Sequence, residues 1–379
     1  MSSENGIFTE AMLEEAAIEI LQSLDYDYAF GPDISLGGDY EERKDYREVI
    51  LSQRVKDALF KINRDLPREA LDDAYRQLIT FNSPMLEENN RYFHQLMTEG
   101  IEVSFNEGGH IRTKRAYIID FENMSNNEFV VVNQFTIIEN EERRPDLIVF
   151  VNGLPLVVIE LKSASDENVG IDSAYNQIQT YKRDIPSLFN YNAFCILSDG
   201  INAKAGTITS NEEWFMNWRT ADGEDIAPLS QPQYEVLLNG MFQKERLLDI
   251  MHNFIIFQES KEPEKDLDGK KIGDKKSIIK ILAAYHQYFA VKKAIEKTKE
   301  ATKEDGDRKI GVIWHTQGSG KSFSMVFYTG GLVRELNNPT IVVITDRNDL
   351  DDQLFTTFTK SKDILRQTPK QATVRKLSD

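Results

Sequence analysis

The sequence predicts an α/β protein of two domains, in which a mixed sheet flanked by helices precedes a lobe of parallel strands and helices. At 379 residues, the chain is long for a single hydrophobic core. Two uninterrupted apolar runs, 147–151 and 154–159, flank the turn dipeptide Asn152-Gly153 and predict a buried hairpin. A strand–loop–helix–strand pattern over 309–345 is typical of a parallel sheet. These observations place the two domains at 1–255 and 256–379.

The first domain is predicted to open with a helix capped by Thr9, because Leu13, Ala17, Ile20 and Leu24 repeat at helical spacing. Further helices are expected over 46–62, 68–79, 171–183 and 234–252, and strands over 116–121, 128–138, 147–151, 155–162 and 193–197.

The second domain is predicted to follow an exposed connector over 259–276, which is dense in Lys, Glu, Asp and Gly. Helices are expected over 278–297, 321–336 and 348–358, strands over 309–315 and 340–345, and a loop over 316–320.

The composition describes an ordinary globular protein, with 40% hydrophobic and 28% charged residues. The formal net charge of -17 argues against a protein that coats nucleic acid nonspecifically. Basic residues still gather at Arg112/Lys114/Arg115, Arg143-Arg144 and Lys182-Arg183. Each group is either solvated surface charge or a local DNA contact.

The sequence contains neither a membrane span nor a secretion signal that we can identify. Its apolar runs end well before eighteen residues, and residues 1–10 lack an apolar signal core. Cys195 is the only cysteine, so no internal disulfide can form. We therefore expect a cytoplasmic protein without membrane contact.

Two carboxylates and a lysine, Asp146, Glu160 and Lys162, stand at the open end of the predicted hairpin. Charges among apolar residues need compensation, and a divalent metal would provide it. A regular two-residue turn would set Asp146 opposite Ile159, on the wrong face for Glu160. We therefore predict a bulge that turns Asp146 toward Glu160.

This arrangement predicts magnesium-dependent phosphodiester hydrolysis. Asp146, Glu160 and the Leu161 carbonyl would hold Mg²⁺, which polarises the phosphate and activates a water. Lys162 would position that water or stabilise the developing charge. The alternative is a surface hairpin that ends in an ordinary Glu–Lys pair.

The pattern Pro-Asp, buried hairpin and Glu-x-Lys resembles the PD-(D/E)xK nuclease superfamily. Gln177 and Tyr181 match the Gln-x-x-x-Tyr element of some members, and the resemblance places their helix beside the active site. The resemblance also implies an additional acid on an early helix. Glu10 is preferred over Glu14, Glu15 and Glu19, although compensation of the helix dipole explains these acids equally well.

A phosphate-binding loop is predicted in the second domain, because a strand, a Gly-rich turn and a helix succeed one another. Lys321 would reach the β and γ phosphates of ATP, and Ser322 would bind its magnesium. His315 stands where a strict P-loop has Gly. The residues of this loop are Thr316, Gln317, Gly318, Ser319, Gly320, Lys321 and Ser322.

The loop resembles the first ATP-binding motif of superfamily 2 helicases and translocases, which implies a partial RecA-like lobe. In that comparison Gln287 would read the adenine edge, with Tyr285 or Tyr288 stacking on it, unless these aromatics simply pack a helix. Arg347 would contact a nucleic-acid backbone.

The order of nuclease, connector and motor resembles the restriction (R) subunit of type I restriction–modification enzymes. This resemblance implies double-stranded DNA as substrate, ATP-driven translocation, and methylation and specificity subunits as partners. An Asp-Glu-x-His motif does not follow Ser322. We therefore expect either a truncated fragment or a gene product that has lost its motor, with weak ATP binding, no useful hydrolysis and no translocation.

Two other functions fit the same motifs. The chain could serve as a non-catalytic assembly module that docks on partner subunits, or as a DNA repair or recombination nuclease–helicase that acts at DNA ends.

Overall fold

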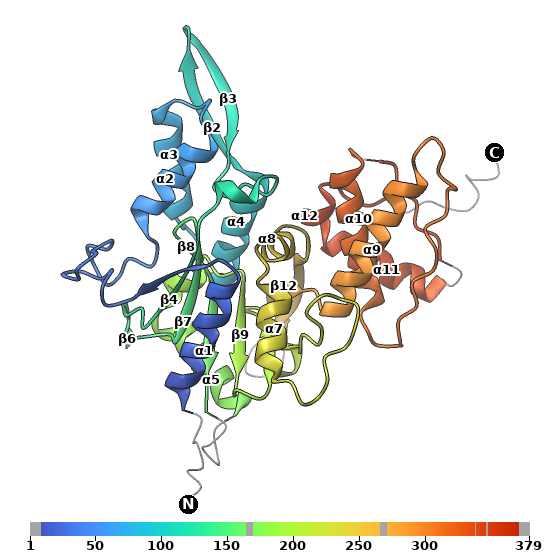
Figure 1. The fold of residues 1–379 in the computed structure, drawn as a ribbon. Coiled ribbons are helices and arrows are strands. Elements are labelled where there is room, and N and C mark those ends of the chain that lie inside the picture. Colours follow the sequence, from blue (N-terminus) through green and yellow to red (C-terminus); the bar gives the residue numbers. More distant parts are fainter. Residues whose placement is uncertain (1–8, 164–169, 266–270, 338, 346–347, 371–379) are drawn as a thin grey trace, which may run out of the picture. The chain divides into compact units, whose positions relative to one another are not determined.

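The computed structural model describes residues 9–163, 170–265, 271–337, 339–345 and 348–370. The chain forms two compact units, Met1–His252 (unit 1) and Asn253–Asp379 (unit 2), each with its own sheet and helices (Figure 1). The division lies three residues before the boundary set from the sequence.

Unit 1 is built on a mixed six-stranded sheet in the order β1-β4-β7-β8-β9-β10 (Figure 1). The pairs β1/β4 and β8/β9 are parallel and the other neighbours are antiparallel. The strands are β1 (Asp27–Phe30), β4 (Phe129–Asn133), β7 (Leu147–Val151), β8 (Leu154–Leu161), β9 (Phe194–Ser198) and β10 (Ala203–Gly206).

The four central strands of this sheet are buried along their whole length. That burial explains why β7 and β8 form continuous apolar runs in the sequence. Helix α1 (Glu10–Ser23) packs against β1, β4 and β8, and α5 (Ile171–Asp184) packs against β8 and β9. The predicted mixed sheet flanked by helices is thus confirmed.

Most predicted helices of unit 1 are present. The Thr9 hydroxyl caps α1 by accepting from the Met12 amide (3.3 Å). The predicted helix 46–62 begins only at Ser52, and the predicted helix 234–252 is broken near Phe242. The remaining helices are α2 (Ser52–Ile62), α3 (Arg68–Ile79), α4 (Leu86–Glu99), α6 (Pro186–Phe189), α7 (Gln233–Met241) and α8 (Lys244–Asn253), with 3-10 turns at Met124–Asn126 and Glu212–Trp214.

Two small antiparallel pairs complete unit 1. Strands β2 (Ile101–Glu107) and β3 (His110–Ala116) form a ribbon that extends away from the central sheet (Figure 1). Strands β5 (Ile137–Ile138) and β6 (Glu142–Arg143) form the other pair. The predicted strand 116–121 was wrong, because β3 ends at Ala116.

Unit 2 contains an antiparallel hairpin of β11 (Ile255–Lys265) and β12 (Lys271–Leu282). The sequence predicted a connector and the start of a helix here, which was wrong. Burial alternates along β12, with Ile278 and Lys280 buried and Ile279 exposed, and this period belongs to a strand. The helices are α9 (Tyr285–Ala301), α10 (Lys321–Glu335), α11 (Asn348–Lys360) and α12 (Lys362–Leu365).

The parallel strands predicted for unit 2 are not formed. Residues 309–315 and 340–345 pair with no strand in the described part of the chain. Val312, Trp314 and Ile344 are 93%, 92% and 83% exposed. An apolar strand of a parallel sheet needs neighbouring strands and cover over both faces, whereas these segments pair with no strand among the described residues and leave most of their apolar side chains exposed. The predicted RecA-like parallel sheet is therefore not observed.

Candidate functional site

The bulge predicted between β7 and β8 is present. Val151 pairs with Leu154 across the Asn152-Gly153 turn, and Leu147 pairs with Ile159, so the register shifts by one residue between them. Both turn residues have positive φ, 52° for Asn152 and 77° for Gly153, as a two-residue hairpin turn requires. The extra residue lies on β8, and it places Asp146 opposite Glu160 instead of Ile159.

The shifted register brings the predicted site residues together. The Asp146 Oδ2 atom accepts a hydrogen bond from the Leu161 amide (2.7 Å). The Lys162 ammonium donates to Glu160 Oε1 (2.8 Å) and to the Leu161 carbonyl (3.1 Å). These are two of the oxygens that the sequence assigned to a metal, so a cationic group already lies against them.

Burial disfavours ionisation of both carboxyl groups, Asp146 and Glu160. Loss of solvent raises the pKa of Glu160 to about 8, with further repulsion from Asp146. Burial likewise raises the pKa of Asp146 to about 6, opposed by the Leu161 amide and Lys162. Two carboxyls with raised pKa values on one sheet face form a site that gains from an added positive charge.

The donor set at this face fits a hard dication. Among the described residues, buried Glu160 Oε2 has no partner at full hydrogen-bonding distance, and the neighbouring Tyr181 hydroxyl, which donates to the Arg144 carbonyl (3.4 Å), lowers the pKa of Glu160 only weakly. No group of three or more His, Cys, Asp or Glu side chains in the described ranges could hold a metal ion. A magnesium ion needs only one or two carboxylates, because it keeps several waters.

Helix α1 brings two further acids to the site. Glu10, the acid preferred from sequence, lies 3.5 Å from the Lys162 ammonium. Glu14 is one turn farther along, and its carboxylate raises the pKa of Asp146 more than that of Glu10 does. The structure therefore brings Glu14 as well as Glu10 to the pair of acids.

Sequence reasoning missed the two amides that hold Glu14. The Asn133 and Gln134 side chains donate to its two carboxylate oxygens (2.6 and 2.8 Å), and the Gln134 backbone amide donates to the Asp146 carbonyl (3.3 Å). Gln134 adopts a left-handed φ of 54°. The signal was a pair of polar residues directly after the apolar run of β4.

Gln177 and Tyr181 lie on α5, one turn apart. The Tyr181 hydroxyl donates to the Arg144 carbonyl, and burial together with the negative charge of Glu160 raises the pKa of Tyr181. A hydrogen bond with Gln177 has the opposite, smaller effect on the same pKa. The structure thus places the pair beside Asp146 and Glu160.

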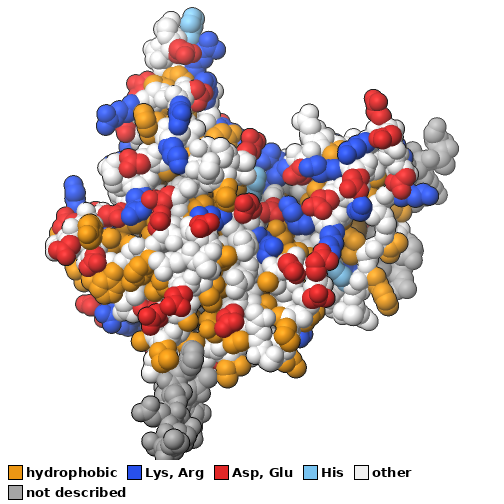
Figure 2. Space-filling view, in the orientation of Figure 1, with side chains coloured by type: hydrophobic (Ala, Val, Ile, Leu, Met, Phe, Trp, Pro, Cys, Tyr) orange, Lys and Arg blue, Asp and Glu red, His pale blue; other side chains and the backbone are white. Residues whose placement is uncertain are grey.

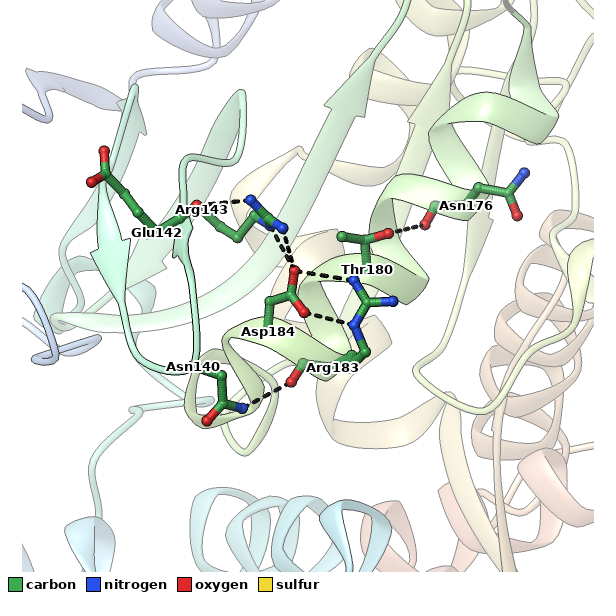
Figure 3. Close-up of polar contacts among 7 residues, drawn as sticks. All are labelled: Asn140, Glu142, Arg143, Asn176, Thr180, Arg183 and Asp184. Carbon is green, nitrogen blue, oxygen red and sulfur yellow. Dashed lines mark hydrogen bonds and ion pairs between the residues drawn. The ribbon is translucent and has the colours of Figure 1, made fainter.

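The end of α5 is tied to the segment that leads to Asp146 (Figure 3). Buried Asp184 accepts from Arg143 (2.8 Å) and from Arg183 (2.7 Å), which lower its pKa. The Asn140 side chain adds a bond to the Arg183 carbonyl (3.0 Å). Arg143 and Arg183, two of the basic residues weighed as DNA contacts, therefore share one carboxylate that fastens β6 to α5.

The predicted phosphate loop lies at the start of α10, a helix of 15 residues. Gly318 and Gly320 have left-handed φ values of 82° and 75°, which glycine adopts without strain. Lys321 folds back and donates to the Thr316 carbonyl (2.9 Å), and Ser319 Oγ donates to the same carbonyl (2.8 Å). The first N–H groups of a helix lack intrahelical acceptors, so this end can receive an anion. Gln317 lies in the exposed turn, and Ser322 is the partly buried second residue of α10.

Gln287 lies against this loop. Its side-chain oxygen accepts from the Ala284 amide (2.8 Å), and its nitrogen donates to the Gly320 carbonyl (3.0 Å). A Cβ at Gly320 would approach that nitrogen to 2.6 Å, so glycine permits the contact. Reading of adenine by Gln287 stays a prediction that requires these bonds to open. Tyr288 is buried against Phe254, as the packing alternative expects, and Arg347 lies outside the described residues.

Comparison with known families gives two matches. Residues 7–214 match the N-terminal part of the type I restriction enzyme R protein, and residues 286–379 match the SWI2/SNF2 ATPase family. The first match spans more than half of the chain and contains every residue of the carboxylate site.

Curated relatives resemble almost the whole chain. The type I restriction enzyme HindI endonuclease subunit of Haemophilus influenzae is 41% identical over 96% of the chain. A candidate type I restriction enzyme endonuclease subunit of Methanocaldococcus jannaschii, MjaIXP, is 34% identical over 92% of it. The chain spans about a third of the length of these two relatives, 34% in each case. Among the helices of the described ranges, none has the length and apolar composition that a membrane crossing requires.

Proposed function

Because this chain belongs to the family of type I restriction enzyme R protein N termini, we propose that unit 1 is a magnesium-dependent DNA endonuclease domain of the PD-(D/E)xK kind. The observation that carries the proposal is the bulge that sets Asp146 opposite Glu160, with Lys162 on the same face. A hairpin without chemistry would gain nothing from burying two carboxylates at its end.

The roles of the residues follow from their contacts. Asp146, Glu160 and the Leu161 carbonyl would hold Mg²⁺, which supplies a polarised phosphate and an activated water when bound. Lys162, partly buried and hydrogen-bonded to Glu160, would offer its ammonium to the negative charge that develops on the phosphate. The Lys162 ammonium would then be released from Glu160 and would point toward the substrate.

The surrounding residues orient these groups. Tyr181 donates to the carbonyl of Arg144, two residues before Asp146, and so fixes the backbone that leads into the site. Gln177 holds the Tyr181 hydroxyl from one turn away. Glu14, held by two amides, adds negative charge near Asp146 and so favours a bound cation.

For unit 2 we propose an ATP-binding loop over Thr316–Ser322, with Lys321 as the phosphate ligand and Ser322 as the ligand of its magnesium. The match to SWI2/SNF2 ATPases and the glycine geometry at the start of α10 support this part.

The proposal extends to the complex in which the protein acts and to its location in the cell. The relatives are named as endonuclease subunits of type I restriction enzymes, which supports a role in a restriction–modification complex that acts on double-stranded DNA. Methylation and specificity subunits would be the partners there, and cleavage in the longer proteins would be coupled to ATP-driven translocation. A cytoplasmic location agrees with this setting.

The test is nicking of supercoiled plasmid by an excess of the chain in Mg²⁺ or Mn²⁺, compared with Asp146→Asn. The wild-type chain should nick the plasmid, and EDTA and the variant should each abolish the reaction. Asp45→Asn, at an exposed acid of the same unit, is the matched control and should nick normally. Equal nicking by Asp146→Asn, or none by the wild type, would contradict the proposal.

A further inference from the structure

The β2–β3 ribbon has one covered side and one open strand. On β2, Ile101, Val103 and Phe105 are buried, and this strand packs against α3. On β3 every residue from His110 to Arg115 is exposed, and Ile111 is 81% exposed. The two strands join at Gly108-Gly109, where both φ values are positive and an added Cβ atom would meet no other group within 4 Å. The ribbon thus presents a slender tip and a free strand to its surroundings.

The loop between α2 and α3 extends this open strand. The Asn63 side chain donates to the Tyr117 carbonyl (2.7 Å), and Asp65 forms an ion pair with Lys114 (2.9 Å). Residues 61–68 therefore lie along the base of β3. We call the two segments together, 61–68 and 107–116, the basic ridge.

The charge of the basic ridge is opposite to that of the whole chain. It holds six cations and two carboxylates, a net charge of +4, whereas the chain carries -17. The carboxylates, Asp65 and Glu107, lie in ion pairs with Lys114 and Arg112. Figure 2 shows Lys and Arg side chains on this projecting part of unit 1, interspersed with acidic ones. The six cations are Lys61, Arg64, Arg68, Arg112, Lys114 and Arg115, and all are exposed.

We propose that the basic ridge binds the phosphate backbone of double-stranded DNA and holds the duplex on unit 1. This proposal rests on the proposed function for the identity of its ligand. A chain of net charge -17 repels a polyanion at long range, so binding requires a local surface of the opposite sign. Phosphate contacts by Lys and Arg release counterions and supply most of the sequence-independent affinity. A two-stranded ribbon also fits the major groove, and the side-chain-free Gly108-Gly109 tip allows close approach.

The test measures binding of a labelled DNA duplex by fluorescence anisotropy, in EDTA and at several salt concentrations. The full chain is compared with Arg112→Gln/Arg115→Gln, which removes two cations and leaves the Lys114–Asp65 pair in place. The slope of log affinity against log salt should fall by about 2, because each lost phosphate contact removes about 0.9. Over a fourfold rise in salt, the variant should therefore lose about tenfold less affinity than the wild type.

Two further variants control for charge and folding. Lys44→Gln/Arg47→Gln removes the same charge from another exposed part of unit 1 and should leave the slope unchanged. Arg112→Lys/Arg115→Lys keeps the charge and should retain the wild-type slope. Both outcomes are needed if the ridge, and not the net charge or the fold, supplies the contacts.

The outcomes separate this inference from the proposed function. Three results would overturn the proposal for the basic ridge. They are an unchanged slope in Arg112→Gln/Arg115→Gln, an equal change of slope in Lys44→Gln/Arg47→Gln, and no duplex binding by the wild type. If the slope for Arg112→Gln/Arg115→Gln equals that of the wild type while Asp146→Asn abolishes nicking, the proposal for the basic ridge is wrong and the proposal for the active site is supported. If the ridge variant loses its slope while Asp146→Asn still nicks, the active-site proposal fails alone.

Discussion

Replacing Glu160 by Gln should make the metal-free protein more stable at alkaline pH while removing a predicted metal ligand. Gln imitates the protonated carboxyl in size and in hydrogen bonding to Lys162. Burial, and then repulsion from Asp146, raises the pKa of Glu160 from its ordinary value of 4.5 to about 8 in the folded protein. The folded state therefore prefers the neutral carboxyl, and ionisation opposes folding.

The sign and size of the effect follow from linkage. A carboxyl with a raised pKa imposes no penalty below its unfolded pKa, and the penalty grows as the pH rises through the folded pKa. Relative to a protein with a permanently neutral side chain at this position, the free energy of unfolding of the wild type should be lower by about 1 kcal/mol at pH 5 and by about 4 kcal/mol at pH 8. Glu160→Gln should therefore gain about 3 kcal/mol of relative stability between these two pH values.

The assay is urea unfolding in EDTA, followed by tryptophan emission at pH 5 and pH 8. Trp218 is buried in unit 1, whereas Trp314 in unit 2 is 92% exposed, so the change in emission reports mainly on unit 1. In Mg²⁺ at pH 8 the wild type should recover stability, by about 3 kcal/mol at a hundredfold excess over Kd, and the variant should not. Equal stability differences at the two pH values would refute the burial of an ionisable Glu160 on which the site depends.

Three more predictions concern both sites. Binding of Mg²⁺ at pH 7 should release about one proton, mainly from Glu160, whose pKa is about 8, and less from Asp146, whose pKa is about 6. Calorimetry in buffers of different ionisation enthalpy measures the number of protons released. Zero release would contradict the assignment of these two carboxylates as metal ligands. Lys162→Met should lower the rate of nicking by about 100-fold or more while Mn²⁺ binding persists, and an unchanged rate in the plasmid assay would remove Lys162 from the chemistry. Gly320→Ala should weaken binding of a fluorescent ATP analogue, because a side chain at φ 75° strains the phosphate loop and its Cβ, 2.6 Å from the Gln287 side-chain nitrogen, would displace that amide. Gly311→Ala, also left-handed at φ 99° but open and outside the loop, should bind the analogue better, and equal binding by the two variants would argue against a role for the Gly320 backbone.

The carboxylate site was accessible from sequence because its chemistry constrains its geometry. Asp146 and Glu160 can share an ion only on one face of the sheet, and Asn152-Gly153 alone would set them on opposite faces. The bulge therefore followed from strand periodicity, and the observed register contains it. Helix α3, Arg68–Ile79, was also found at its predicted bounds because its apolar residues repeat cleanly.

Other elements escaped sequence reasoning for identifiable reasons. The β2–β3 ribbon has a Gly108-Gly109 turn signal, but its outer strand is polar and lacks the alternation that identifies a half-buried strand. The β11–β12 hairpin was interpreted as a connector because its tip is rich in charged residues. Asn133 and Gln134 reach the site where the Gln134 backbone is left-handed. A left-handed conformation is uncommon for a non-glycine residue, so the sequence did not predict it.

The unpaired segments of unit 2 illustrate a different difficulty. Residues 309–315 have the composition of a buried strand, yet strand formation depends on neighbours and not on composition alone. Their apolar side chains are exposed in the described part of the chain, Val312 and Trp314 most of all.

Every catalytic role assigned to unit 1 requires one dication to bind between Asp146 and Glu160. Anomalous diffraction from a crystal soaked in Mn²⁺ at pH 8 would locate that ion. A single strong peak should lie about 2 Å from an oxygen of each carboxylate. Diffraction with no peak between these side chains at saturating Mn²⁺ would show that the two acids do not share an ion.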